Sequence, residues 1–237
     1  MANLPAGTVT LAFTDIEGST FLLRRLGDRY GELLSRHRSI IREAFTAGGG
    51  IEVDRQGDAF FFVFARAREA VGAAVSAQAA HAAASWPDDA TVRVRIGLHT
   101  GEPTIGDEGY LGIDVVKGAR ICNLARGGQI LLSETTYALA ASSLPPGVVV
   151  VPAGERQLKD VDDPELVYLL AIDAAERSRA ARFSLPAGWE RKIDERFGTV
   201  GTEVVSRLGE RIVGSLESES LEHLVGRAVS VARHGNR

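Results

Sequence analysis

The chain has 237 residues, of which 45% are hydrophobic, 24% charged and 6% aromatic. An apolar fraction of this size excludes a wholly disordered protein. The chain carries 27 basic and 31 acidic residues, and its net charge of −4 does not favour a nucleic-acid-binding protein that relies on bulk charge. No run approaches the roughly 18 consecutive apolar residues that a membrane span needs.

The single cysteine and the first residues of the chain indicate the cellular compartment in which we expect the protein. Because Cys122 is the one cysteine, the chain cannot form an internal disulfide, and a cysteine-based zinc site is not expected. The opening sequence, MANLPAGTVT, has no basic segment followed by an apolar one, so we expect no signal peptide. We therefore expect a reduced, cytoplasmic protein.

The first part of the chain alternates between strand and helix patterns. A strand is predicted over residues 9–14, and after a tight loop a single helix is predicted from 21 to about 45, ending at three glycines. Two short apolar runs, 51–54 and 59–64, flank a turn and predict a hairpin. An alanine-rich helix is expected over 66–85.

The next part contains the clearest strand pattern, a strict alternation over 92–98. A glycine-rich loop is expected over 101–112. Beyond it we predict helices over 115–125 and 134–141, and strands over 129–133, 148–151, 156–158 and 166–172. Strands and helices interleave without a strict repeat, which favours an α+β or mixed α/β layer fold.

The composition changes near Asp173, where an alanine- and arginine-rich stretch begins. We therefore expect a main domain over 8–172, a linker over 173–188 and a helical tail over 189–237. The apolar stripe of the tail is expected to pack on the main domain or on a partner subunit. A membrane-surface helix is the competing interpretation, which the mixed charges of the tail disfavour.

Two aspartates stand beside glycines, Asp15 in FTDIEGST and Asp58 in RQGDAFF. Either one alone is typical of a turn or a cap. If the strand over 9–14 neighbours the hairpin, both carboxylates reach one edge of the sheet, and such hard oxygen ligands suit Mg²⁺ or Mn²⁺. The loop over 16–20 runs into a helix N-terminus, whose N–H groups suit a polyphosphate.

Four motifs in order, VTLAFTDIEGST, QGDAFFFVF, VRVRIGLHTGEP and GARICNLARGGQILLSETT, resemble the catalytic domain of the class III adenylate/guanylate cyclases. The resemblance covers about residues 8–172 and is closest to the small bacterial members. It implies an α+β, ferredoxin-like domain with a central mixed sheet flanked by helices, extended here by the helical tail. It also implies a homodimer that converts a nucleoside triphosphate, with ATP expected first, to a 3′,5′-cyclic nucleotide and pyrophosphate.

The resemblance further implies roles for individual residues. Asp15, Asp58 and the backbone carbonyl of Ile16 would hold two Mg²⁺ or Mn²⁺ ions per site, and Arg120 would stabilise the transition state. The residues expected to bind phosphate are Gly18, Ser19, Thr20, Phe21, Arg95 and Lys159. In this class the arginine faces the metals of the other subunit, so the site would be shared by two copies of the chain.

Other interpretations of these residues stay open. Arg95 and Lys159 are also compatible with solvated strand charges, and His99 is assigned no chemistry. Where purine cyclases commonly have a base-selecting lysine, this chain has Asp54, and the second base-selecting position falls near Gly109 by counting. Where they commonly have an asparagine that orients the ribose, this chain has Val116, whose side chain cannot form hydrogen bonds.

These departures leave three interpretations. The enzyme is active and selects its base differently, which includes guanine and pyrimidines; or it is slow because one orienting hydrogen bond is lost; or it is a degenerate homologue that binds nucleotide or a partner without turnover. A nucleotide-sensing or structural dimer module is the rival from another class. A third possibility is a different metal-dependent phosphotransferase on the same scaffold, although the GGDEF-type signature is absent.

Overall fold

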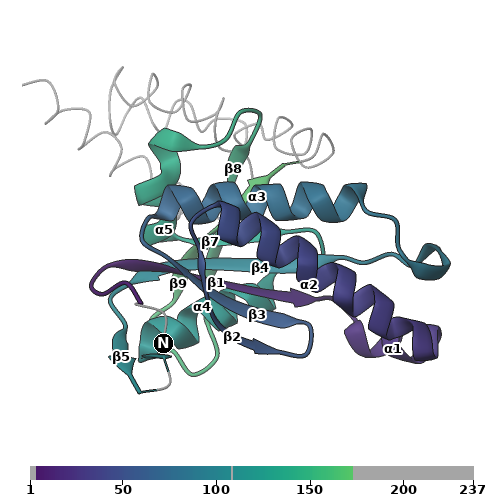
Figure 1. Ribbon diagram of the computed structural model, residues 1–237. Helices are drawn as coiled ribbons and strands as arrows, with labels where there is room; N and C mark the ends of the chain where they lie inside the picture. Colours follow the sequence, from purple (N-terminus) through teal and green to yellow (C-terminus); the bar gives the residue numbers. More distant parts are fainter. Residues whose placement is uncertain (1–3, 108, 173–237) are drawn as a thin grey trace, which may run out of the picture. The chain divides into compact units, whose positions relative to one another are not determined.

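A computed structural model describes residues 4–107 and 109–172 of the chain (Figure 1). The described residues divide into two compact units. The first contains residues 4–146 and 157–165, and the second contains residues 147–156 and 166–172. The predicted linker and tail, 173–237, lie outside the described residues.

The first unit is built on a mixed sheet of five strands in the order β2-β3-β1-β4-β7. These strands are β1 (Val9–Ile16), β2 (Ile51–Gln56), β3 (Ala59–Phe64), β4 (Val94–Gly101) and β7 (Ile130–Ser133). β1 pairs antiparallel with both β3 and β4, whereas β4 and β7 are parallel. The predicted α+β class with a central mixed sheet is therefore confirmed.

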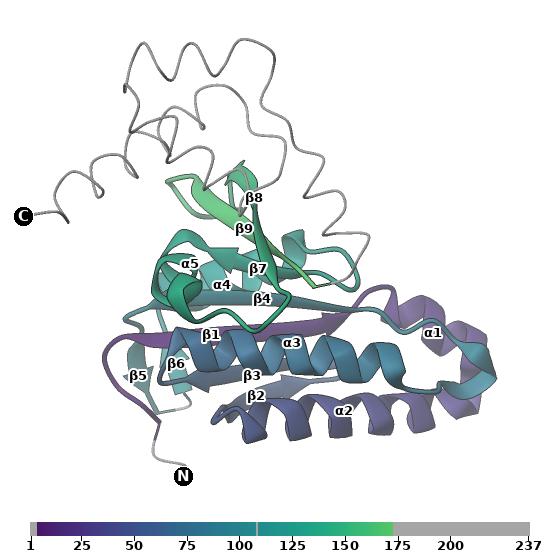
Figure 2. The same ribbon diagram turned by 90° about the horizontal axis from the view of Figure 1, so that it is seen from above.

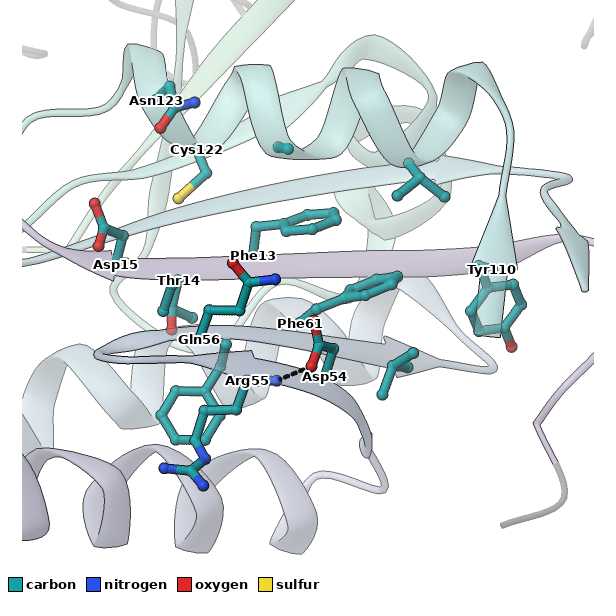
Figure 3. Close-up of a pocket in the computed structure, with 15 residues that line it drawn as sticks. Phe13, Thr14, Asp15, Asp54, Arg55, Gln56, Phe61, Tyr110, Cys122 and Asn123 are labelled. Atoms are coloured by element: carbon teal, nitrogen blue, oxygen red, sulfur yellow. Dashed lines mark hydrogen bonds between the residues drawn. The ribbon is translucent and has the colours of Figure 1, made fainter. Parts of the chain in front are cut away.

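Helices cover both faces of this sheet. The helices of this unit are α1 (Ser19–Leu26), α2 (Tyr30–Ala47), α3 (Ala67–Ala83), α4 (Ile113–Leu124) and α5 (Glu134–Ala140), of which α1 packs beside α2. Figure 2 shows α2 and α3 running side by side along the sheet, and α4 packs against β1 and β4 on the opposite face (Figure 3).

The aromatic run of β3 explains how the two faces become different. Side chains alternate along a strand, so Phe60, Phe62 and Phe64 point to one face and Phe61 points to the other. On the first face the ring of Phe45 from α2 lies 5.0 Å from that of Phe62. On the second face Phe61 stacks on Phe13 of β1 with ring centroids 4.4 Å apart. The second face thus presents an aromatic floor beneath α4.

The close approach of α4 to the sheet depends on one glycine. A Cβ at Gly97 of β4 would lie 2.3 Å from the backbone nitrogen of Cys122, well inside van der Waals contact. The absence of a side chain at Gly97 therefore lets the backbone of α4 approach the strand directly. Cys122 is buried there, and burial raises the pKa of its thiol to about 12.

The predicted long helix over 21–45 is wrong in one respect. It is two helices, α1 and α2, separated by a short 3₁₀ turn at Gly27–Arg29. Gly27 has φ of +52°, a left-handed backbone conformation that ends α1 and that other residues adopt at a cost. The apolar pattern continues across the break, which is why periodicity alone predicts one helix.

One loop prediction and one strand prediction are also corrected. The expected loop over 101–112 contains a small antiparallel hairpin of β5 (Thr104–Gly106) and β6 (Gly109–Leu111), which is too short to give a periodic signal. The strand expected over 156–158 is absent as a separate element, because Arg156 ends β8 (Val149–Arg156) and the buried Leu158 follows it in a loop.

The second unit contributes β8 and β9 (Glu165–Ala171), which are neighbours in sheet order. Val151 and Ala171 are buried together in a small apolar cluster of this unit. Among the residues that the structure describes, no helix has the length and apolar character needed to cross a membrane.

Candidate functional site

Asp15 and Asp58 are brought together at one end of the β1–β3 pair. Asp15 is the penultimate residue of β1, and Asp58 lies in the two-residue turn between β2 and β3. The backbone N–H of Ile16 donates to Asp58 Oδ2 at 3.1 Å. This bond holds the Asp58 carboxylate beside the end of β1, as the sequence predicts for a pair of acidic ligands.

The environment of Asp15 disfavours its negative charge. Burial raises the pKa of the Asp15 carboxyl, and repulsion by Asp58 raises it further. Arg95 opposes both effects, because it lies opposite Asp15 on β4 and forms an ion pair with it. Arg95 is only 23% exposed, so it is a partly buried partner of Asp15 as well as a candidate phosphate ligand.

The donor set fits a divalent cation. Two carboxylates held close enough to repel each other are stabilised by a positive charge placed between them. Their oxygen atoms are the ligand type that Mg²⁺ and Mn²⁺ prefer, with water and phosphate oxygens completing the shell. The described residues contain no cluster of three or more histidine, cysteine, aspartate or glutamate side chains suited to a metal, so the two aspartates would depend on other donors.

The segment expected to bind phosphate forms the start of α1. Gly18 precedes the helix, and its carbonyl accepts from the N–H groups of Phe21 and Leu22. The side chain of Phe21 is 67% exposed. Ser19 and Thr20 begin the helix next to Asp15 in sequence, where the partial positive charge of a helix N-terminus favours an anion.

Tyr30 is a residue near the site that the sequence analysis missed. It begins α2, and burial together with the charges of Asp58 and Asp15 raises the pKa of its phenol, while the charge of Arg38 lowers it. The phenol of Tyr30 therefore lies within the electrostatic field of the carboxylate pair. No motif marks it, because it lies beyond the break at Gly27.

Arg120 and Lys159 meet at a different place from the carboxylate pair. Arg120 Nη2 donates to Asp160 Oδ2 at 2.9 Å, and Arg120 Nε donates to the carbonyl of Lys159 at 3.2 Å. Lys117, also on α4, pairs with Glu165 at 3.1 Å. One ion pair thus ties α4 to the loop that carries Lys159, and a second ties it to Glu165, where β9 begins.

A pocket of about 600 Å³ lies between α4, β1 and the β2–β3 hairpin (Figure 3). Its floor is the stacked pair of Phe13 and Phe61. The polar side chains that line it include Asp15, Asp54, Gln56 and Asn123; Gln56 and Asn123 stand inside two of the family motifs, but the sequence analysis gives them no role. Such a pocket, flat and aromatic with a few polar groups at its rim, suits a planar ring.

The two base-selecting candidates lie beside each other. Asp54 lines the pocket, and its Oδ1 accepts from the N–H of Arg55 at 2.7 Å. A Cβ at Gly109 would lie 3.1 Å from the side chain of Val53, the residue before Asp54. The structure therefore places Gly109 of β6 against the strand that carries Asp54.

The faces of α4 separate the pocket from Arg120. Val115, Ala119, Cys122 and Asn123 line the pocket, whereas Val116 and Arg120, one turn apart, are not among its lining residues. Within one chain, Arg120 is paired with Asp160 rather than with either aspartate of the carboxylate pair.

Comparison with known proteins gives a consistent picture. The family model for the adenylate and guanylate cyclase catalytic domain matches residues 1–171. An uncharacterised protein of Mycobacterium tuberculosis is 36% identical over 168 residues, which cover 70% of this chain and 56% of that protein. The adenylate cyclase of Lachancea kluyveri is 33% identical over 155 residues, covering 55% of this chain and 8% of that protein.

A solved structure agrees with these sequence matches. A structure of adenylate cyclases from Trypanosoma brucei in their monomeric state superimposes with a TM-score of 0.64 and 26% identity, covering 73% of this chain and 93% of that one. The chain spans about half the length of the mycobacterial relative and a much smaller share of the yeast cyclase.

Proposed function

The chain belongs to the family of adenylate and guanylate cyclase catalytic domains, and from that membership we propose that it is a nucleotidyl cyclase. The proposed reaction converts a nucleoside triphosphate, ATP first, to a 3′,5′-cyclic nucleotide and pyrophosphate. The observation that carries the proposal is the carboxylate pair: Ile16 N–H holds Asp58 next to Asp15, in a setting where burial and the charge of Asp58 disfavour the charge of Asp15.

In the proposed reaction the 3′-oxygen of the ribose gives up its proton and forms a bond to the α-phosphorus. The bond from the α-phosphorus to the bridging oxygen breaks, and pyrophosphate leaves. Asp15 and Asp58 would hold Mg²⁺ or Mn²⁺, with the Ile16 carbonyl as a further ligand. The ions, when bound, lower the pKa of the attacking hydroxyl and neutralise the leaving phosphates.

Other residues of the chain would bind and orient the substrate. The start of α1, Gly18 to Phe21, would bind the phosphates through backbone N–H groups. Arg95 would contact the terminal phosphates while keeping its ion pair with Asp15. Lys159 would add a further positive charge, and the aromatic floor of the pocket would stack on the base.

We propose that Arg120 acts on a substrate bound by a second copy of the chain. Its planar guanidinium suits the charge that spreads over the phosphoryl oxygens in the transition state. The position of Arg120 supports a shared site, because in its own chain it pairs with Asp160 and is not a lining residue of the pocket that contains Asp15.

The base of the nucleotide substrate is inferred from Asp54, which lines the pocket. Asp54 offers only acceptor oxygens while ionised, so it would accept from an amino group of adenine or cytosine, or from N1–H and the amino group of guanine. ATP remains the first candidate, and GTP and the pyrimidine nucleotides are the alternatives that the assay must include.

The decisive experiment incubates the purified chain with each of the four nucleoside triphosphates and Mn²⁺, and measures cyclic product and pyrophosphate. We expect a cyclic product with at least one of them and a loss of about 100-fold or more in the Asp15→Asn variant. Binding of a nucleotide without product from any of the four would instead support the degenerate, nucleotide-binding homologue that Val116 suggests.

A further inference from the structure

The turn that carries Asp58 is held from behind by α2. Arg38 donates from both Nε and Nη2 to the carbonyl of Gly57, at 3.1 and 2.6 Å. The neighbouring residue, His37, donates from Nε2 to the carbonyl of Asp58 at 2.9 Å. Two consecutive residues of one helix therefore bind two consecutive carbonyls of the turn; we call His37 and Arg38 the α2 clamp.

The turn needs such support because little else packs on it. β2 is the edge strand of the sheet, and Arg55, Gln56 and Gly57 are all exposed. Gly57 has φ of +61°, so the chain reverses direction through a glycine with no side chain to pack. A hairpin tip with few buried contacts opens readily unless hydrogen bonds hold it.

The clamp is anchored in the core of the first unit. His37 is fully buried, and its Nδ1 lies 3.0 Å from His81 Nε2 on α3. His81 Nδ1 in turn donates to the carbonyl of Ala77 at 2.8 Å. The turn is thus placed next to α3 through two imidazoles that are buried in contact with each other.

The two sides of Asp58 are held by different elements. Its backbone carbonyl is bound by His37 of α2, and its carboxylate oxygen Oδ2 accepts from the N–H of Ile16 on β1. Groups that fix a ligating carboxylate in this way set how much of its metal affinity is realised.

We propose that His37 and Arg38 are positioning residues that hold the Asp58 carboxylate in place for a divalent metal ion. This inference rests on the proposed function, since it concerns the same metal site. Arg42 provides a contrast, because it lies one turn further along α2 and pairs with Glu52 of β2 at 2.7 Å without touching the turn.

The test compares Arg38→Met with Arg42→Met in the full chain. Both variants remove one positive charge and the α2–hairpin contacts of a partly exposed arginine. Arg42 also lies over the ring of Phe60, so the structural cost of Arg42→Met in thermal unfolding should be at least as large as that of Arg38→Met. Binding of Mn²⁺ alone is measured by electron paramagnetic resonance of the free ion. Hydrogen exchange of the backbone amides at residues 57–59 reports on the turn.

We expect Arg38→Met to weaken Mn²⁺ binding about tenfold and to speed amide exchange at the turn, and Arg42→Met to change either by less than about twofold. Arg38→Lys, which keeps one donor group, should recover part of the loss. Equal Mn²⁺ binding in the wild type and Arg38→Met, or an equal loss in both methionine variants, would overturn the proposal.

His37 is tested by a conservative change because it is buried. His37→Gln keeps an N–H donor and should bind Mn²⁺ better than His37→Leu at equal folded fraction. The results distinguish a failure of the clamp proposal from a failure of the proposed activity. If the chain makes no cyclic nucleotide but Arg38→Met weakens Mn²⁺ binding, the clamp proposal stands and the cyclase proposal fails. If the chain is active but Arg38→Met does not weaken Mn²⁺ binding, or if the chain shows no measurable Mn²⁺ binding, the clamp proposal fails.

Discussion

The charges of Asp15 and Asp58 favour the proposed metal binding, but without metal they weaken the fold. A carboxyl whose pKa is raised by folding contributes stability below its unfolded pKa of about 4, and that contribution is lost as the pH rises. At neutral pH the ionised Asp15 therefore weakens the metal-free fold, and repulsion by Asp58 is one of the causes. Arg95 relieves part of this cost through its ion pair.

Replacing Asp58 by asparagine should separate the effect of its charge on stability from its effect on metal binding. Asp58→Asn keeps an oxygen that can accept from the N–H of Ile16 but removes the charge that repels Asp15. In a chelator at pH 7.5 we expect the midpoint of thermal unfolding to rise by about 2–4 °C, which corresponds to about 1 kcal/mol for a domain of this size. Calorimetry measures it, and a lower midpoint would contradict the assignment.

The same variant should respond differently to metal. Mn²⁺ at millimolar concentration should raise the unfolding midpoint of the wild type, because a ligand that binds only the folded state stabilises it. It should leave Asp58→Asn nearly unchanged. An equal Mn²⁺ effect on both proteins would place the metal elsewhere.

At the scale of the elements, α2 and α3 meet through a buried pair of imidazoles. Burial lowers the pKa of His37 to about 4 and also lowers that of His81. The pair makes three polar contacts, with each other and with two carbonyls, whereas two neutral imidazoles supply only two N–H groups. A third proton would let all three contacts form as hydrogen bonds, but it would give the pair a buried positive charge. The cost of burying that charge lowers the pKa of both histidines.

Stability should therefore fall as the pH drops below 6.5. The unfolded chain binds protons on these histidines near pH 6.5, whereas in the folded chain the pKa of His37 is about 4 and burial also lowers that of His81, so acid favours unfolding. For His37 we expect a loss of about 2 kcal/mol between pH 7.5 and 5.0, measured by urea unfolding. The His37→Gln variant should lose less over the same range; an identical pH dependence would contradict the buried neutral state.

The packing of α4 on β4 gives a second prediction at this scale. Gly97→Ala should destabilise the fold by about 1–3 kcal/mol or more, because its Cβ would meet the backbone of Cys122 at 2.3 Å. Gly72→Ala is the matched control: it lies inside α3, where a Cβ meets nothing within 4 Å. That change should stabilise the helix by up to about 1 kcal/mol, and chemical unfolding of both variants measures the difference.

The elements with strong periodicity could be predicted from the sequence, and those defined by backbone geometry could not. The alternation in β4 and the apolar runs of the β2–β3 hairpin gave their positions closely. The break at Gly27 and the β5–β6 hairpin escaped, because a single left-handed glycine and three-residue strands leave no periodic signal.

The residues of the candidate site also fall into those that the sequence predicts and those that only the folded backbone brings together. Asp15 and Asp58 could be predicted because each stands in a motif at the end of a strand. Arg38 could not, since its role depends on the carbonyl of Gly57, which is near it only in the folded chain. His37 falls on the apolar stripe of its helix, and a polar residue on a buried face was the available signal.

At the scale of the whole molecule, the proposed reaction requires two copies of the chain. The carboxylate pair and the pocket belong to one part of the first unit, whereas Arg120 pairs with Asp160 and is not a lining residue of the pocket. Neither part alone contains the groups that the reaction needs. A protein built in this way should gain specific activity as its concentration rises through the range in which it dimerises.

Mixing two inactive variants tests this claim most directly. Asp58→Asn and Arg120→Ala should each lower cyclase activity by about 100-fold or more when assayed alone. Combined in equal amounts, half of the dimers carry one variant of each kind and hold one intact site, so about a quarter of the wild-type activity should return. A mixture that stays as inactive as its two components, while native mass spectrometry shows that mixed dimers have formed, would contradict a site shared between two chains.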